Sequence, residues 1–139
     1  MAEEARLALV ILAVEELKRA AAFYRAAFGW TQTVDEAVYA EFALPGAVRL
    51  GLYTHVGFGR NAGQAPLKPA RGDITATEIY LVVDDLSAAI ARVEAAGARA
   101  LSPRALRDWG DEAAYFADPD GNVVVLAQPH TPHASPSKP

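Results

Sequence analysis

The pattern of apolar and polar residues along this chain runs through the same order twice. Residues 7–14 are almost all apolar, which is typical of a strand. Apolar residues then recur at helical spacing from Leu17 to Phe28, and Gly29 ends the predicted helix. Alternating positions and turn residues indicate three further strands. The first half is therefore predicted as βαβββ, over residues 7–14, 17–28, 31–36, 38–44 and 48–54.

The second half repeats this order. Its predicted elements cover residues 78–83, 86–97, 99–105, 112–118 and 122–128. Short motifs also match between the halves, since AVEEL corresponds to VVDDL and FALPG to FADPD. We therefore predict an α+β fold in which two tandem βαβββ modules form a cupped, mostly antiparallel sheet with outer helices.

One domain is expected over residues 1–128. Its parts are a first module, a linker and a second module, at about residues 7–54, 55–74 and 75–128. The linker is rich in Gly and Pro, which predicts an irregular loop that is functional or mobile. Residues 129–139 are rich in proline and poor in apolar residues, which predicts a disordered tail. His130 and His133 are therefore expected to be solvated rather than bound to a metal.

Composition and charge exclude several classes of function. The 139 residues carry a formal net charge of −4, so no basic surface for nucleic acid is expected. The absence of cysteine excludes disulfides, thiolate metal sites and a cysteine nucleophile. The apolar stretch at residues 7–14 is too short to span a bilayer, and Glu3 and Glu4 precede it where a signal peptide has basic residues. We expect a cytoplasmic protein that binds neither nucleic acid nor membranes.

Two motifs connect the chain to a known superfamily. FYRAAFGW in the first helix and YFADPDGNVVVL near the end resemble the vicinal oxygen chelate superfamily. This group includes glyoxalase I, extradiol dioxygenases and bleomycin-binding proteins, and the resemblance covers about residues 7–128. It implies the tandem βαβββ fold. It does not imply one reaction, because the superfamily contains isomerases, lyases, oxygenases and metal-free binders.

In metal-dependent members of that superfamily, four inward positions hold the ion, and they are usually His or Glu. Matching the motifs LVILAVEEL, RLGLY, EIYLVVDDL and VVVLAQ carries these positions onto Leu9, Gly51, Glu78 and Val125. Only Glu78 offers a side-chain donor. A single carboxylate is too few ligands for Zn²⁺, Ni²⁺ or Fe²⁺. We therefore expect no metal in the inherited site and predict no cofactor.

Glu78 and three tyrosines are the main candidates for a ligand site. If strand parity is right, Glu78 faces the inside of the cup, where it would bind a ligand group or act as an acid or base. An equally weighted interpretation is a solvated carboxylate at a strand end. Tyr53, Tyr80 and Tyr115 share the inward parity and are suited to stacking on a flat ligand. The predicted ligand-binding set is Leu9, Gly51, Tyr53, Glu78, Tyr80, Tyr115 and Val125.

A displaced metal site is a less favoured hypothesis. It would use His55, the only histidine outside the tail, together with Glu41 and Glu78. A lone histidine in a loop is more often polar surface.

Three functions remain open from the sequence. We favour a metal-independent binder of a small apolar or aromatic molecule. The alternative is a lyase, isomerase or dioxygenase that uses a rearranged metal site, or Glu78 as acid or base, with the linker as a lid. A module that regulates a partner protein is a third hypothesis, for which the sequence offers no specific sign. A homodimer is expected, because strand edges such as residues 7–14 need cover.

Overall fold

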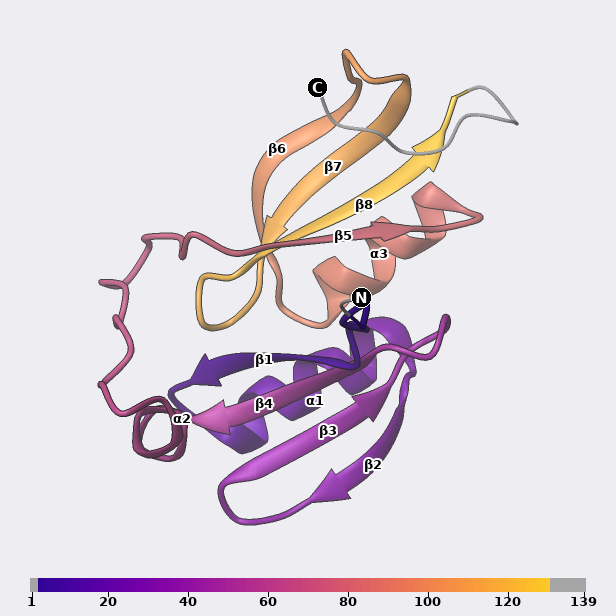
Figure 1. Ribbon diagram of the computed structural model, residues 1–139. Coiled ribbons are helices and arrows are strands. Elements are labelled where there is room, and N and C mark those ends of the chain that lie inside the picture. The colour runs from indigo at the N-terminus through magenta and orange to yellow at the C-terminus, as the bar shows by residue number, and fades with distance from the viewer. Residues whose placement is uncertain (1–2, 131–139) are drawn as a thin grey trace. The chain divides into compact units, whose positions relative to one another are not determined.

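The structure of the protein is a computed structural model that describes residues 3–130, and the chain divides into two compact units (Figure 1). The boundary follows residue 68, and residues 26–28 group with the second unit. The elements up to this boundary are β1 (Leu9–Val14), α1 (Leu17–Phe28), β2 (Thr31–Asp35), β3 (Tyr39–Ala43), β4 (Arg49–Thr54) and α2 (His55–Ala62). Those after it are β5 (Glu78–Val82), α3 (Leu86–Ala95), β6 (Arg99–Leu106), β7 (Asp111–Ala117) and β8 (Val123–Pro129).

The two sheets have the same topology. The first is ordered β1-β4-β3-β2 and the second β5-β8-β7-β6. In each sheet the first strand pairs in parallel with the last, and the other pairs are antiparallel. The registers correspond as well, since Ile11 lies opposite Gly51 and Tyr80 lies opposite Val125. The predicted α+β fold of two βαβββ modules is confirmed.

One face of the first sheet packs on α1 and forms its core. Strand residues on this face alternate with those on the other face, as period-two patterning requires. They are Leu12, Val14, Ala40, Phe42, Leu50 and Leu52, all at most 4% exposed. The helix contributes the buried residues Ala20, Ala21 and Tyr24 at helical spacing.

The second sheet is built in the same way around α3. Leu86, Ala89 and Val93 are the buried residues of this helix. The Asp85 carboxylate caps the helix by accepting a hydrogen bond from the Ala88 backbone N–H at 3.1 Å. The opposite face of each sheet, turned away from its own helix, is called the open face below. None of the helices in residues 3–130 is long and apolar enough to cross a membrane.

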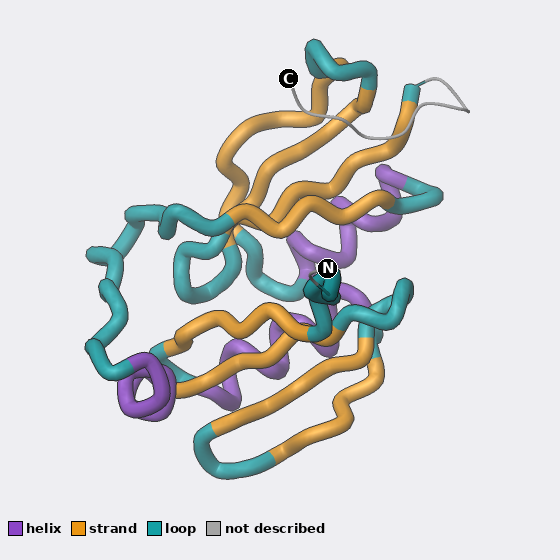
Figure 2. Tube along the Cα trace, viewed as in Figure 1, coloured by secondary structure: helices purple, strands orange, loops and turns teal. Residues whose placement is uncertain are grey.

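The linker differs from the sequence prediction at its start. We predicted an irregular loop over residues 55–73, but residues His55–Ala62 form α2. The Thr54 hydroxyl caps this helix by accepting a hydrogen bond from the Gly57 backbone N–H at 3.2 Å. Three glycines within or just after the segment give it a low helix propensity, which is why the sequence predicted a loop. The helix forms despite this composition. Residues 63–77 contain no helix or strand, as expected (Figure 2).

The end of the second sheet also extends beyond the predicted boundary. β8 includes Pro129, which lies opposite Asp111. The backbone N–H of His130 then donates to the Gly110 carbonyl at 3.0 Å. The chain therefore follows the sheet into the segment predicted as a tail, whereas His133 lies outside the described residues.

The turn between β7 and β8 is held by the side chain of Asp118. Its Oδ1 accepts hydrogen bonds from the backbone N–H groups of Asp120 and Asn122, each at 2.9 Å. Gly121 adopts φ +85°, and a Cβ there would lie 2.6 Å from the Asp73 carbonyl oxygen. Only glycine fits this position, because a side chain meets both backbone strain and a backbone clash.

Gly121→Ala is expected to lower the free energy of unfolding by about 2–4 kcal/mol through strain and overlap. Gly46→Ala is the matched control, because Gly46 has φ +90° and open space around its Cβ position. It should cost only about 1 kcal/mol. Urea unfolding of both variants measures the difference, and equal losses would contradict the close approach at Gly121.

Candidate functional site

The predicted site residues lie on the open faces of the two sheets. In the first sheet, Leu9, Gly51 and Tyr53 share this face, as strand pairing shows. In the second sheet, the open face carries Glu78, Tyr80, Tyr115 and Val125. The sequence parity therefore assigned these residues to the expected face within each unit.

A hydrogen-bonded cluster covers the open face of the first sheet. The Tyr39 hydroxyl donates to Oε1 of Glu41 at 2.6 Å, and Nη1 of Arg49 donates to Oε2 at 3.0 Å. Glu41 is only 7% exposed, so these two donors replace the water that burial removes from its carboxylate. Burial, reinforced by the hydrogen bond to Glu41, raises the pKa of Tyr39. Tyr39 is therefore held as a neutral donor.

The Tyr39 ring occupies the space beside Gly51. A Cβ added at Gly51 would overlap the Tyr39 hydroxyl, and it would lie 2.9 Å from both Cε1 and Cζ of the ring. Glu41 is the direct strand partner of Gly51 on β3. The position to which the superfamily resemblance assigns a metal ligand is thus filled from the neighbouring strand. Tyr53 packs beside Tyr39 with ring centroids 5.0 Å apart.

The second sheet carries a similar pair at one end of its open face. The Tyr80 hydroxyl donates to Oδ2 of Asp111 at 2.5 Å and accepts from Nε1 of Trp109 at 2.7 Å. Asp111 is fully buried, and its Oδ1 has no hydrogen-bond partner within residues 3–130. Burial, followed by the hydrogen bond to Asp111, raises the pKa of Tyr80 to about 12. The carboxylate therefore depends on the Tyr80 hydroxyl.

Val125 lies beneath aromatic side chains in the same unit. It is fully buried in a cluster with Ala113, Val123 and Ala127, against which Tyr80, Leu101 and Tyr115 pack. The guanidinium carbon of Arg107 lies 5.0 Å from the centroid of the Tyr115 ring, in a cation–π arrangement. Nη2 of Arg107 also donates to the Pro103 carbonyl at 2.7 Å. These contacts fix Tyr115 over the sheet.

Glu78 differs in exposure from the other candidates. It begins β5 opposite Val123 and is exposed. Both interpretations of Glu78, a ligand group and a carboxylate at a strand end, stay open. The displaced metal site stays a hypothesis, with Glu41 bound to Tyr39 and Arg49 in the first unit and Glu78 in the second. Within residues 3–130, no three His, Cys, Asp or Glu side chains come together as metal ligands would.

Sequence reasoning missed the polar partners of the tyrosines. Tyr39 and Glu41 are two residues apart on one strand, so their shared face was a usable signal. Asp111 lies 31 residues from Tyr80, and no local pattern connects them.

Comparison with known proteins places the chain in a family. Residues 9–127 match the family model described as the glyoxalase-like domain. The chain belongs to this family. No curated protein matches it.

Solved structures share the fold of this glyoxalase-like domain. A glyoxalase-related enzyme from Fulvimarina pelagi has 22% identity and a TM-score of 0.78, over 88% of this chain and 87% of the other. A glyoxalase/bleomycin resistance protein/dioxygenase from Nocardioides has 20% identity and a TM-score of 0.79, over 100% and 93%. A glyoxalase/bleomycin resistance protein/dioxygenase family enzyme from Burkholderia phytofirmans PsJN has 19% identity and a TM-score of 0.75, over 89% and 98%. At these identities the likeness concerns the fold.

The overlap at Gly51 gives a direct test of the first cluster. Gly51→Ala is expected to lower the free energy of unfolding by about 1–3 kcal/mol, because its Cβ meets the Tyr39 ring. In a Tyr39→Ala background the same substitution should cost much less, because the ring is gone. Urea unfolding of the wild type, both single variants and the double variant measures this coupling. Additive effects would show that the ring does not occupy this space.

The raised pKa of Tyr80 predicts a loss of stability at alkaline pH. A tyrosine in the unfolded chain has a pKa of about 10. The folded-state pKa of Tyr80 is about 12. The stability that neutral Tyr80 contributes is therefore fully present below the pKa of an unfolded tyrosine, and it is lost as the pH rises through the folded-state pKa. Tyr80→Phe should therefore reduce the alkaline loss, as measured by urea unfolding from about pH 8 to about pH 12. Identical pH dependence in both proteins would rule out this contribution.

Proposed function

We propose that this glyoxalase-like domain binds a small flat aromatic or apolar molecule without using a metal. One observation carries the proposal: in each unit, a tyrosine hydroxyl bound to a buried carboxylate holds an aromatic ring over an inherited ligand position. Leu9, Gly51 and Val125 offer no side-chain donor to an ion.

The tyrosines provide surfaces suited to stacking. Tyr39, Tyr53, Tyr80 and Tyr115 are all partly buried, so part of each residue stays accessible. The hydroxyl bonds of Tyr39 and Tyr80 keep these rings from reorienting. A ligand that stacks on either ring therefore loses less binding free energy to ordering the protein. Aromatic stacking adds to the free energy gained by burying the ligand's apolar surface.

Charged groups near the rings would orient the ligand. The Arg49 side chain is 46% exposed while it pairs with Glu41, so it can also reach an anionic or carbonyl group. Glu78, exposed on the open face of the second sheet, would accept a hydrogen bond from an amine or hydroxyl of a ligand. Acid–base chemistry on Glu41 or Asp111 is disfavoured, because these buried carboxylates already accept hydrogen bonds from tyrosine hydroxyls. The predicted homodimer and cytoplasmic location stay predictions.

Naphthol, a flat aromatic molecule with one hydroxyl, is the probe for this proposal. Its affinity is measured from the change in its fluorescence when the protein is added. Tyr53→Ala should weaken naphthol binding to the open face of the first unit about 3–10-fold, and Tyr115→Ala should do the same for the open face of the second unit, as expected for loss of one stacking partner in each. Leu67→Ala is the control, because Leu67 is an apolar residue that is 96% exposed in the linker. Its binding should match the wild type.

The metal arm of the experiment compares EDTA-treated protein with the same protein after Zn²⁺, Ni²⁺ or Fe²⁺ is added. The affinity for naphthol should be the same in all samples. Binding that requires added metal would overturn the metal-independent function, and binding unaffected by both tyrosine substitutions would overturn the proposed site.

A further inference from the structure

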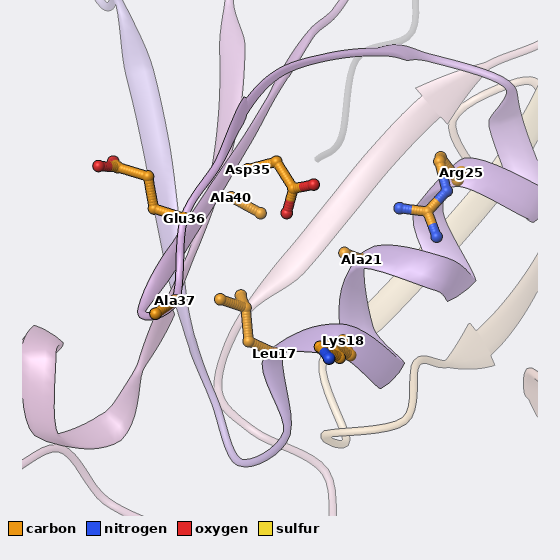
Figure 3. Close-up of a pocket in the computed structure, with 8 residues that line it drawn as sticks. All are labelled: Leu17, Lys18, Ala21, Arg25, Asp35, Glu36, Ala37 and Ala40. Carbon is orange, nitrogen blue, oxygen red and sulfur yellow. The ribbon is translucent and has the colours of Figure 1, made fainter.

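A separate cavity of about 300 Å³ lies in the first unit, between α1 and the hairpin that joins β2 to β3 (Figure 3). Its lining residues are Leu17, Lys18, Ala21, Arg25, Asp35, Glu36, Ala37 and Ala40. Ala40 belongs to the face of the sheet that packs on α1, whereas its neighbours Tyr39 and Glu41 belong to the open face. The cavity is therefore distinct from the tyrosine-lined surface described above.

Charges of opposite sign stand on opposite walls of this cavity. Lys18 and Arg25 come from α1, seven residues apart on one side of the helix, and Asp35 ends β2. Figure 3 shows the Asp35 carboxylate and the Arg25 guanidinium turned toward the space between them, while Glu36 points away. In the described part of the chain, no ion pair joins Asp35 to either cation. Arg25 instead donates through Nη1 to Gln32 at 2.8 Å.

Small side chains leave open space between the helix wall and the hairpin wall of the cavity. Ala21 on the helix and Ala37 and Ala40 on the hairpin leave room that larger residues would fill. Leu17 adds an apolar surface beside them. A cavity of this size with a few convergent charged groups matches the usual form of a small-molecule site. The separated charges would then be neutralised by a ligand that carries both signs.

We propose that this cavity binds a dicarboxylic α-amino acid, for which L-glutamate is the probe. The two carboxylates of such a ligand pair with Lys18 and Arg25, and its ammonium group pairs with Asp35. Its methylene groups lie against Leu17 and Ala21. Lys18, Arg25 and Asp35 together carry one positive charge, which the single net negative charge of the ligand balances. This site goes beyond the proposed function, because it uses neither the tyrosines nor the open faces.

Asp35 provides the selectivity that two cations alone would lack. Glutarate has the same two carboxylates but no ammonium group, so it leaves the Asp35 carboxylate facing another anion. Calorimetric titration of the full chain should therefore show that L-glutamate binds at least about tenfold more tightly than glutarate. Asp35→Asn should weaken L-glutamate binding at least about tenfold without weakening glutarate, and Lys18→Met should weaken both.

Glu36→Gln is the matched control, because it removes the same charge from the next residue, whose side chain points away from the cavity. It should bind L-glutamate as the wild type does. Naphthol binding should be unchanged in all three variants, which separates this site from the proposed function. No L-glutamate binding at about 10 mM, equal affinity for glutarate, or equal effects of Asp35→Asn and Glu36→Gln would each overturn the proposal.

Discussion

The open face of each sheet depends on one kind of interaction, a tyrosine hydroxyl that donates to a buried carboxylate. Glu41 and Asp111 lie among apolar strands, where an unpaired carboxylate would be costly. Tyr39 and Tyr80 supply the direct hydrogen bonds that make burial of these groups tolerable. The same hydrogen bond also restrains the tyrosine, because the carboxylate fixes where each aromatic ring can lie.

This constraint explains how a glyoxalase-like domain can keep its scaffold while its open faces change in chemistry. The parallel pairing of β1 with β4 and of β5 with β8 brings the inherited ligand positions onto these faces. On this chain two of these positions, Gly51 and Val125, lie against tyrosine rings, and the Tyr39 ring occupies the space that a side chain at Gly51 would need. The fold sets which positions converge, and the side chains at those positions set what they can bind.

The sequence predicted the sheets and the direction of the site residues because both depend on local periodicity. Tyr53, Tyr80 and Tyr115 were assigned to the correct face from strand parity alone. The partner of Tyr80 could not be found in this way, because Asp111 reaches it through the pairing of β5, β8 and β7. Helix α2 was missed because its cap at Thr54 is a single hydrogen bond within a glycine-rich segment. Long-range contacts and single caps therefore required the structure.

The most direct measurement of this account is the exchange of the tyrosine hydroxyl protons with water, followed by NMR. We predict that the Tyr39 and Tyr80 hydroxyl protons both exchange slowly enough to be observed, because each is held on a buried carboxylate. Glu41→Gln should abolish the protection at Tyr39 alone, and Asp111→Asn should abolish it at Tyr80 alone. Hydroxyl protons that exchange as fast as those of a free tyrosine in the wild-type protein would contradict the account.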